Sequence, residues 1–86
     1  MICWVYILQN ENGRFYIGSS AYPENRVIEH NSGKTKSIKY GIPWRLVFKQ
    51  QYSSREEAVQ TELRLKNYKN KEIIKKIVQE QIILGP

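Results

Sequence analysis

The chain has 86 residues, of which 41% are hydrophobic and 26% charged, values typical of one small globular domain. This length excludes a second domain and an internal repeat. No apolar run approaches the roughly 20 residues that a membrane span needs, and the first residues lack the basic start and long apolar stretch of a secretory signal. We therefore expect a single cytosolic domain over residues 1–86, with a frayed tail at about 83–86.

Fourteen lysines and arginines against eight acidic residues give a formal net charge of +6, with most of the excess after Gly33. Such a charge favours an anionic partner, with nucleic acid first and a membrane surface second, although it can also serve solubility alone. Cys3 is the only cysteine and His30 the only histidine. An internal disulfide and a Cys/His zinc centre are therefore excluded, whereas oxygen-ligated magnesium or manganese stays open.

The first elements in chain order are two aromatic and branched segments at residues 4–8 and 15–17, separated by a polar stretch. They predict a hairpin that turns near Asn12 and Gly13. Alternate side chains of a strand share a face, so Tyr6 and Tyr16 converge if the register places them opposite each other.

A helix is predicted next, because Pro23 suits its first turn and Gly33 suits a stop after Asn31. Arg26 and His30 are four residues apart and therefore project from one face of this helix. The polar, basic segment 32–41 is expected to be a surface loop.

Alternation over residues 43–49, ending near Tyr52, predicts a third strand. Ser54 and Glu57 then form a capping-box pattern that opens a second helix with a broad apolar stripe. The stripe consists of Ala58, Val59, Thr61, Leu63 and Leu65. Glu62 falls inside it, so its carboxylate is expected to face the sheet rather than open water.

The last element is an amphipathic helix with Lys75 and Lys76 outward. Its apolar positions are Ile73, Ile74, Ile77, Val78 and Ile82. Together the elements predict an α+β fold, a three-stranded antiparallel sheet flanked by helices in the order β-β-α-β-α-α.

The candidate site residues are Tyr6, Tyr16, Arg26, His30 and Glu62. Taken singly, the first four have simpler explanations. Buried tyrosines usually fill cores, an arginine on a helix is usually solvated, and a lone histidine is more often structural than catalytic. Glu62 differs, because a charge in an apolar stripe requires a cation or metal beside it.

The ordered combination of motifs is more specific than its members, and up to about Lys71 it resembles the nuclease core of the GIY-YIG superfamily, in particular its small stand-alone bacterial branch. The matching positions are Val5-Tyr6, Tyr16-Ile17-Gly18, Ser19-Ser20, Arg26, Glu29-His30-Asn31, Gly33, Pro43-Trp44, Ser53-Ser54, Ala58 and Glu62. The chain departs from the pattern in three places: Trp4 replaces the glycine of the first motif, Ile38 replaces a hydroxyl residue, and Tyr22 replaces a capping acid.

The resemblance implies a metal-dependent endonuclease that hydrolyses nucleic-acid phosphodiesters, with DNA as the expected substrate and repair or recombination as the setting. Tyr6 and Tyr16 would be the paired motif tyrosines, and either Tyr6 or His30 the general base. Arg26 would contact the phosphate, and His30 would be the accessory polar residue one turn later. Glu62 would be the sole protein ligand of one Mg²⁺ or Mn²⁺.

Four lysines are expected to contact the nucleic-acid backbone: Lys34, Lys36, Lys39 and Lys66. A partner protein could supply specificity, since no further DNA-binding domain is expected. The alternative function is a nucleic-acid-binding module with the same fold and no activity. A third is an interaction protein that uses Trp44 and the isoleucine-rich last helix.

Overall fold

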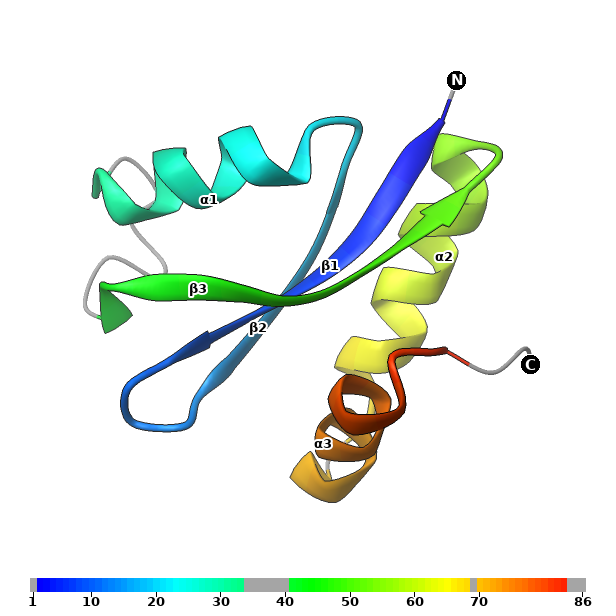
Figure 1. Cartoon of the computed structure of the whole chain (residues 1–86). Helices are drawn as coiled ribbons and strands as arrows, with labels where there is room; N and C mark the ends of the chain where they lie inside the picture. The colour runs from blue at the N-terminus through cyan, green and yellow to red at the C-terminus, as the bar shows by residue number, and fades with distance from the viewer. Residues whose placement is uncertain (1, 34–40, 69, 84–86) are drawn as a thin grey trace.

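The computed structural model describes residues 2–33, 41–68 and 70–83. Its elements are β1 (Cys3–Asn10), β2 (Phe15–Ser20), α1 (Pro23–Asn31), β3 (Trp44–Tyr52), α2 (Arg55–Lys66) and α3 (Lys71–Glu80). The strands form one antiparallel sheet in the order β2-β1-β3 (Figure 1). The predicted α+β class and the element order β-β-α-β-α-α are confirmed.

Helices cover both faces of the sheet, with α1 on one face and α2 and α3 on the other (Figure 1). Side chains of β1 alternate between the two layers, as the pleat of a strand requires. Val5 and Ile7 are fully buried in the core beneath α2 and α3. Tyr6 and Leu8 point the other way and pack with Trp44 in a smaller core beneath α1. The central strand is therefore buried on both sides.

The hairpin between β1 and β2 turns where the sequence predicts. Oδ1 of the buried Asn10 accepts hydrogen bonds from the backbone N–H groups of Asn12 (3.1 Å) and Arg14 (2.9 Å). Gly13 adopts a φ of 79°, a left-handed conformation that favours glycine. The turn thereby fixes how β1 and β2 pair.

A side-chain clamp joins the end of α1 to the start of β3. Oδ1 of Asn31 accepts the backbone N–H of Trp44 at 2.6 Å, and its Nδ2 donates to the Trp44 carbonyl at 2.8 Å. Trp44 is only 3% exposed. This burial removes Trp44 from any surface available to a partner protein.

The second helix begins as predicted, because Oγ of Ser54 accepts the backbone N–H of Glu57 at 3.2 Å. The predicted stripe was too wide, however, since Leu63 is 55% exposed. Ala58 and Leu65 are seven residues apart, about two turns, and share the buried face with Glu62 between them. Leu63 lies about 100° further round the helix from Glu62.

The C-terminal segment also differs from the prediction. α3 packs through Ile74 and Ile77, whereas Ile73 is 38% exposed. The helix ends at Glu80, and Ile82 lies beyond it at 48% exposure. Ile83, expected in a frayed tail, is 6% exposed, and its N–H donates to Oε1 of Gln50 at 2.9 Å. Residues 84–86 lie outside the described part.

Within the described part of the chain, no helix combines the length and apolar character needed to cross a membrane.

Candidate active site

Two tyrosines and the histidine meet on the α1 face of the sheet. The ring centroids of Tyr6 and Tyr16 are 6.4 Å apart, and the ring of His30 meets Tyr16 edge-on at 5.0 Å. The register pairs Tyr6 with Gly18 and Tyr16 with Leu8. The two tyrosines are therefore diagonal neighbours and not directly opposite each other, which still places both phenols on one face.

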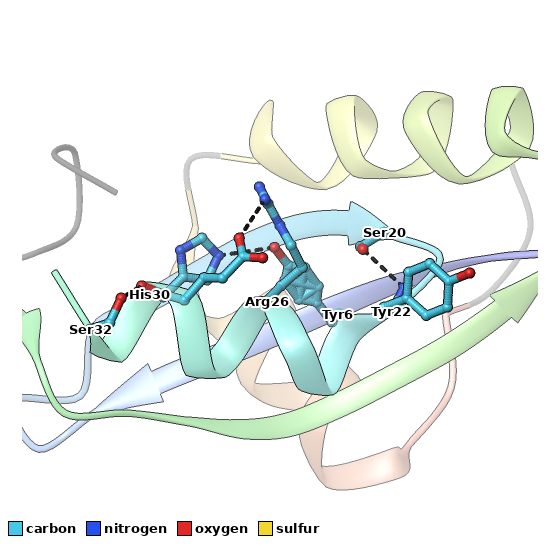
Figure 2. A network of polar contacts seen from close by, with 7 residues as sticks. Tyr6, Ser20, Tyr22, Arg26, His30 and Ser32 are labelled. Carbon is cyan, nitrogen blue, oxygen red and sulfur yellow. Dashed lines mark hydrogen bonds and ion pairs between the residues drawn. The ribbon is translucent and has the colours of Figure 1, made fainter. Parts of the chain in front are cut away.

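A buried hydrogen bond links Tyr6 to α1. The Tyr6 hydroxyl and Nε2 of His30 are 3.1 Å apart, and both residues are at most 1% exposed (Figure 2). The predicted spacing of Arg26 and His30 on one helical face holds, since Arg26 lies one turn before His30 and next to Tyr6 in the same view. A helix whose ends are fixed by Pro23 and by the Asn31 clamp thus delivers both side chains to the sheet.

Arg26 carries the positive charge of this cluster. Its Nη1 forms a half-exposed ion pair with Oε2 of Glu29 at 3.0 Å (Figure 2). The same guanidinium interacts with the Tyr6 hydroxyl, and this interaction raises the pKa of Arg26. A guanidinium can only donate hydrogen bonds, so the oxygen of Tyr6 is the acceptor in that contact.

Burial dominates the protonation of the cluster. It raises the pKa of Tyr6 above its ordinary value, and the opposing effect of Arg26 is smaller, while the charges of Tyr16 and Glu62 add to the increase. Burial, together with the charge of Arg26, lowers the pKa of His30. At neutral pH the site therefore holds a neutral phenol beside a neutral imidazole.

Glu62 approaches the same region from the other helical layer. Its side chain is 16% exposed, which agrees with the prediction that it faces the sheet. Oε1 accepts the hydroxyl of Ser19 at 2.5 Å, and Oε2 pairs with Nζ of Lys66 at 2.6 Å. Lys66 also lies 5.9 Å from the ring centroid of Tyr16. β2 is an edge strand, and Glu62 on the α2 side of the sheet and the tyrosines on the α1 side lie on either side of it, close enough for the charge of Glu62 to affect the pKa of Tyr6.

Two partners of Glu62 were not predicted. Lys66 follows Glu62 by four residues, an acid-to-lysine spacing that favours an ion pair on a helix and could have indicated this contact. Ser19 is 43 residues away in the chain, and no pattern in the sequence pairs it with Glu62. Lys66, expected to contact the nucleic-acid backbone, has its ammonium on the carboxylate. Lys34, Lys36 and Lys39 lie outside the described residues.

The donor set at Glu62 suits a hard divalent cation. Among the residues that the structure describes, no three histidine, cysteine or acidic side chains gather to hold a metal. The carboxylate of Glu62 and the adjacent hydroxyl of Ser19 are oxygen donors of the kind that Mg²⁺ and Mn²⁺ prefer. The ammonium of Lys66 on Oε2 shows that this position attracts positive charge. These residues fit an ion whose other ligands are water or substrate oxygens.

Comparison with known proteins assigns the chain to a family. Residues 2–77 match the GIY-YIG catalytic domain, and the chain belongs to this family. It is similar to a UPF0213 protein of Staphylococcus epidermidis, at 35% identity over 75 residues that cover 86% of this chain and 92% of the relative. It is also similar to a UPF0213 protein of Streptococcus pneumoniae, at 36% identity over 67 residues that cover 77% and 68% of the two chains.

A solved structure shares the fold. The solution structure of a UPF0213 protein from Bacillus halodurans superposes with a TM-score of 0.59 at 29% identity, covering 94% of this chain and 87% of the other. The expected resemblance to small bacterial GIY-YIG proteins is thus confirmed, and the family is one of nucleases.

Proposed function

We propose that this protein is a cytosolic, divalent-metal-dependent endonuclease that hydrolyses phosphodiester bonds in DNA, with a role in repair or recombination. The observation that supports it best is the buried hydrogen bond between Tyr6 and His30, with Arg26 on the Tyr6 oxygen. A buried phenol hydrogen-bonded to a buried imidazole is costly unless the protonation of both groups is used or fully satisfied. The chain belongs to a nuclease family, which supports a use of these groups in phosphodiester hydrolysis.

We assign the direction of proton transfer from Tyr6 to His30. In this assignment the Tyr6 oxygen accepts from Arg26 while its hydroxyl donates to Nε2 of His30, which requires the neutral tautomer of His30 with hydrogen on Nδ1. The raised pKa of Tyr6 disfavours a standing phenolate. We therefore assign a relay, in which Tyr6 takes a proton from the attacking water as it passes its own to His30. The two predicted candidates for the general base then act together.

We assign Arg26 to the scissile phosphate. Its ion pair with Glu29 is half-exposed, so a phosphate can compete for the guanidinium at modest cost. A guanidinium binds phosphate oxygens through two parallel hydrogen bonds and offsets the negative charge that grows during attack. Tyr16, whose ring meets that of His30 edge-on, would orient the water or a phosphate oxygen.

Glu62 and Ser19 would hold the divalent ion, which when bound supplies Lewis-acid stabilisation of the leaving oxygen. Ser19 keeps the carboxylate at the edge of β2, and Lys66 neutralises it until the ion arrives. The charge of Glu62 raises the pKa of Tyr6, so the residues proposed to hold the metal and the cluster around Tyr6 are linked electrostatically.

The test is cleavage of duplex, single-stranded, flapped and junction DNA, with and without Mg²⁺ or Mn²⁺, by wild type, Glu62→Ala and Glu56→Gln. Glu56 is an exposed acid in the first turn of the same helix and serves as the matched control. We expect metal-dependent cutting by wild type and Glu56→Gln, and binding without cutting by Glu62→Ala. Undiminished cutting by Glu62→Ala would discard the metal assignment.

The second candidate is a nucleic-acid-binding module without activity. The Lys66–Glu62 ion pair favours this candidate, because a carboxylate that a lysine of the same helix already neutralises needs no metal. This candidate predicts that the wild-type protein binds every substrate of the panel in EDTA and cuts none of them when the metal is added.

A further inference from the structure

A surface pocket of about 370 Å³ opens beside Arg26, where the end of β2 meets the first turns of α1 and α2. Its lining includes Ser19, Ser20, Tyr22, Arg26 and Arg55. The volume falls within the roughly 300–1,000 Å³ range of small-ligand sites. The proton relay from Tyr6 to His30 does not use this pocket. Arg26 belongs to both sites, because it lines the pocket and also contacts the Tyr6 hydroxyl.

The charge of the pocket is positive. Arg26 and Arg55 both line it, and of the described residues that line it none is acidic. Arg26 directs Nη1 at Glu29, whereas Arg55 forms no ion pair within the described ranges. Two guanidinium groups facing one pocket form a site for a phosphate, which they can grip through several parallel hydrogen bonds.

The remaining lining groups match the rest of a nucleotide. Oγ of Ser20 accepts the backbone N–H of Tyr22 at 3.0 Å, so its own hydrogen is available for a phosphate or sugar oxygen. Tyr22 is 69% exposed. Figure 2 shows the side chains of Ser20 and Tyr22 next to each other, beyond Arg26 from His30. An exposed aromatic ring beside a phosphate site is a platform on which a base can stack.

We propose that this pocket binds the nucleotide next to the scissile bond, with its phosphate at Arg55 and Arg26 and its base on Tyr22. The inference rests on the proposed function, which assigns the scissile phosphate to Arg26. Arg26 would then contact two successive phosphates, the scissile one and that of the nucleotide in the pocket. A base that stacks on Tyr22 cannot stack in a duplex at the same time. The favoured substrate is therefore a strand with an unpaired nucleotide beside the cut, such as a flap or a gap.

The first test measures binding in EDTA, so that no cleavage occurs, of a labelled oligothymidine and of a duplex of equal length. Arg55→Gln should weaken binding of both by roughly tenfold and reduce the salt slope by about one. Tyr22→Ala should weaken oligothymidine binding by roughly tenfold while duplex binding changes less than about twofold. Arg14→Gln removes the same charge on the hairpin turn, at the opposite end of β1, and is the control.

The second test replaces single phosphates beside the cut by uncharged methylphosphonates. With wild type and Arg14→Gln, one such replacement should slow cleavage by roughly tenfold. With Arg55→Gln the same replacement should cost less than about twofold further, because the contact is already lost. If the methylphosphonate slows cleavage by Arg55→Gln by the same factor as cleavage by wild type, the inference is wrong.

The outcomes separate the two proposals. If wild type cuts nucleic acid but Arg55→Gln and Tyr22→Ala behave like Arg14→Gln, the pocket assignment fails and the nuclease stands. If wild type binds through Arg55 and Tyr22 but never cuts, the nuclease proposal fails and the pocket remains a nucleotide site. If wild type neither binds nor cuts, both fail.

Discussion

Gly18 lies directly opposite Tyr6 in the pairing of β1 with β2, and the phenol of Tyr6 fills the space where a side chain at position 18 would be. A β-carbon there would be 2.5 Å from the Tyr6 hydroxyl oxygen and 2.6 Å from the ring carbon that bears it. The absence of a side chain at Gly18 therefore lets the phenol lie against β2 and reach His30. The glycine of the second motif positions the tyrosine of the first.

Replacement of this glycine should disturb both the fold and the site. Gly18→Ala forces the phenol of Tyr6 away from His30, so cleavage should be lost, and overpacking should lower the free energy of unfolding by about 1–3 kcal/mol. Gly13→Ala is the control, since position 13 has a φ of 79° and open space around it. The control should cost about 1–2 kcal/mol through backbone strain and keep its cleavage rate. Urea denaturation and single-turnover cleavage measure the two effects.

The relay predicts a specific loss on removal of one oxygen. Tyr6→Phe keeps the packing but removes the partner of Nε2 of His30, so cleavage should fall roughly 10²–10⁴-fold. Stability should fall by about 1–3 kcal/mol, since the buried imidazole loses its hydrogen bond to Tyr6. Tyr52→Phe, which removes a hydroxyl that accepts from Gln50, is the matched control on the other face. Equal rates for the two variants would contradict the relay.

The lowered pKa of His30 predicts the pH dependence. The imidazole must be neutral to accept a proton, so kcat/KM should hold down to pH 6.5, the ordinary pKa of histidine, and fall only below it. The unfolded chain takes up that proton near pH 6.5 while the native state resists it. The free energy of unfolding should therefore decrease as the pH falls below 6.5. His30→Gln should lack this decrease, and an acid limb above pH 6.5 would contradict the assignment.

The Lys66–Glu62 ion pair predicts an effect on metal affinity. Lys66 competes with a divalent ion for Oε2, so Lys66→Gln should lower the Mg²⁺ concentration at half-maximal rate by roughly two- to fivefold, as expected for an ion pair of about 0.4–1 kcal/mol. Lys75→Gln breaks a similar pair with Glu72 on α3 and should leave this concentration unchanged. Binding in EDTA by the same variants tests the predicted contact of Lys66 with the nucleic-acid backbone. An unchanged salt slope in Lys66→Gln would exclude that contact.

Local patterns were sufficient to predict most of the fold. Asn12 and Gly13 located the hairpin turn, and Pro23 and Gly33 located α1. These signals depend on backbone geometry within a few residues, which the sequence determines directly. Ile83 was misplaced in a frayed tail because its burial depends on a turn at Gln81, whose φ of 58° few residues other than glycine adopt.

The site was predictable only in part, for a related reason. Tyr6 and Tyr16 could be assigned to one face from strand alternation, and Glu62 could be assigned to the sheet side of its helix. The contact of Ser19 with Glu62 and the fit of Tyr6 against Gly18 depend on register and on the docking of distant elements. Neither the register nor the docking follows from a local sequence pattern, so these two contacts can be identified only in the structure.

The edge position of β2 has a consequence for folding. The phenols belong to the layer that α1 completes, whereas the acid belongs to the layer that α2 completes, and a single border strand separates them. In a chain in which only α1 or only α2 has packed on the sheet, only part of the proposed site is assembled. The proposed cleavage activity should therefore appear only after α1 and α2 have both packed on the sheet.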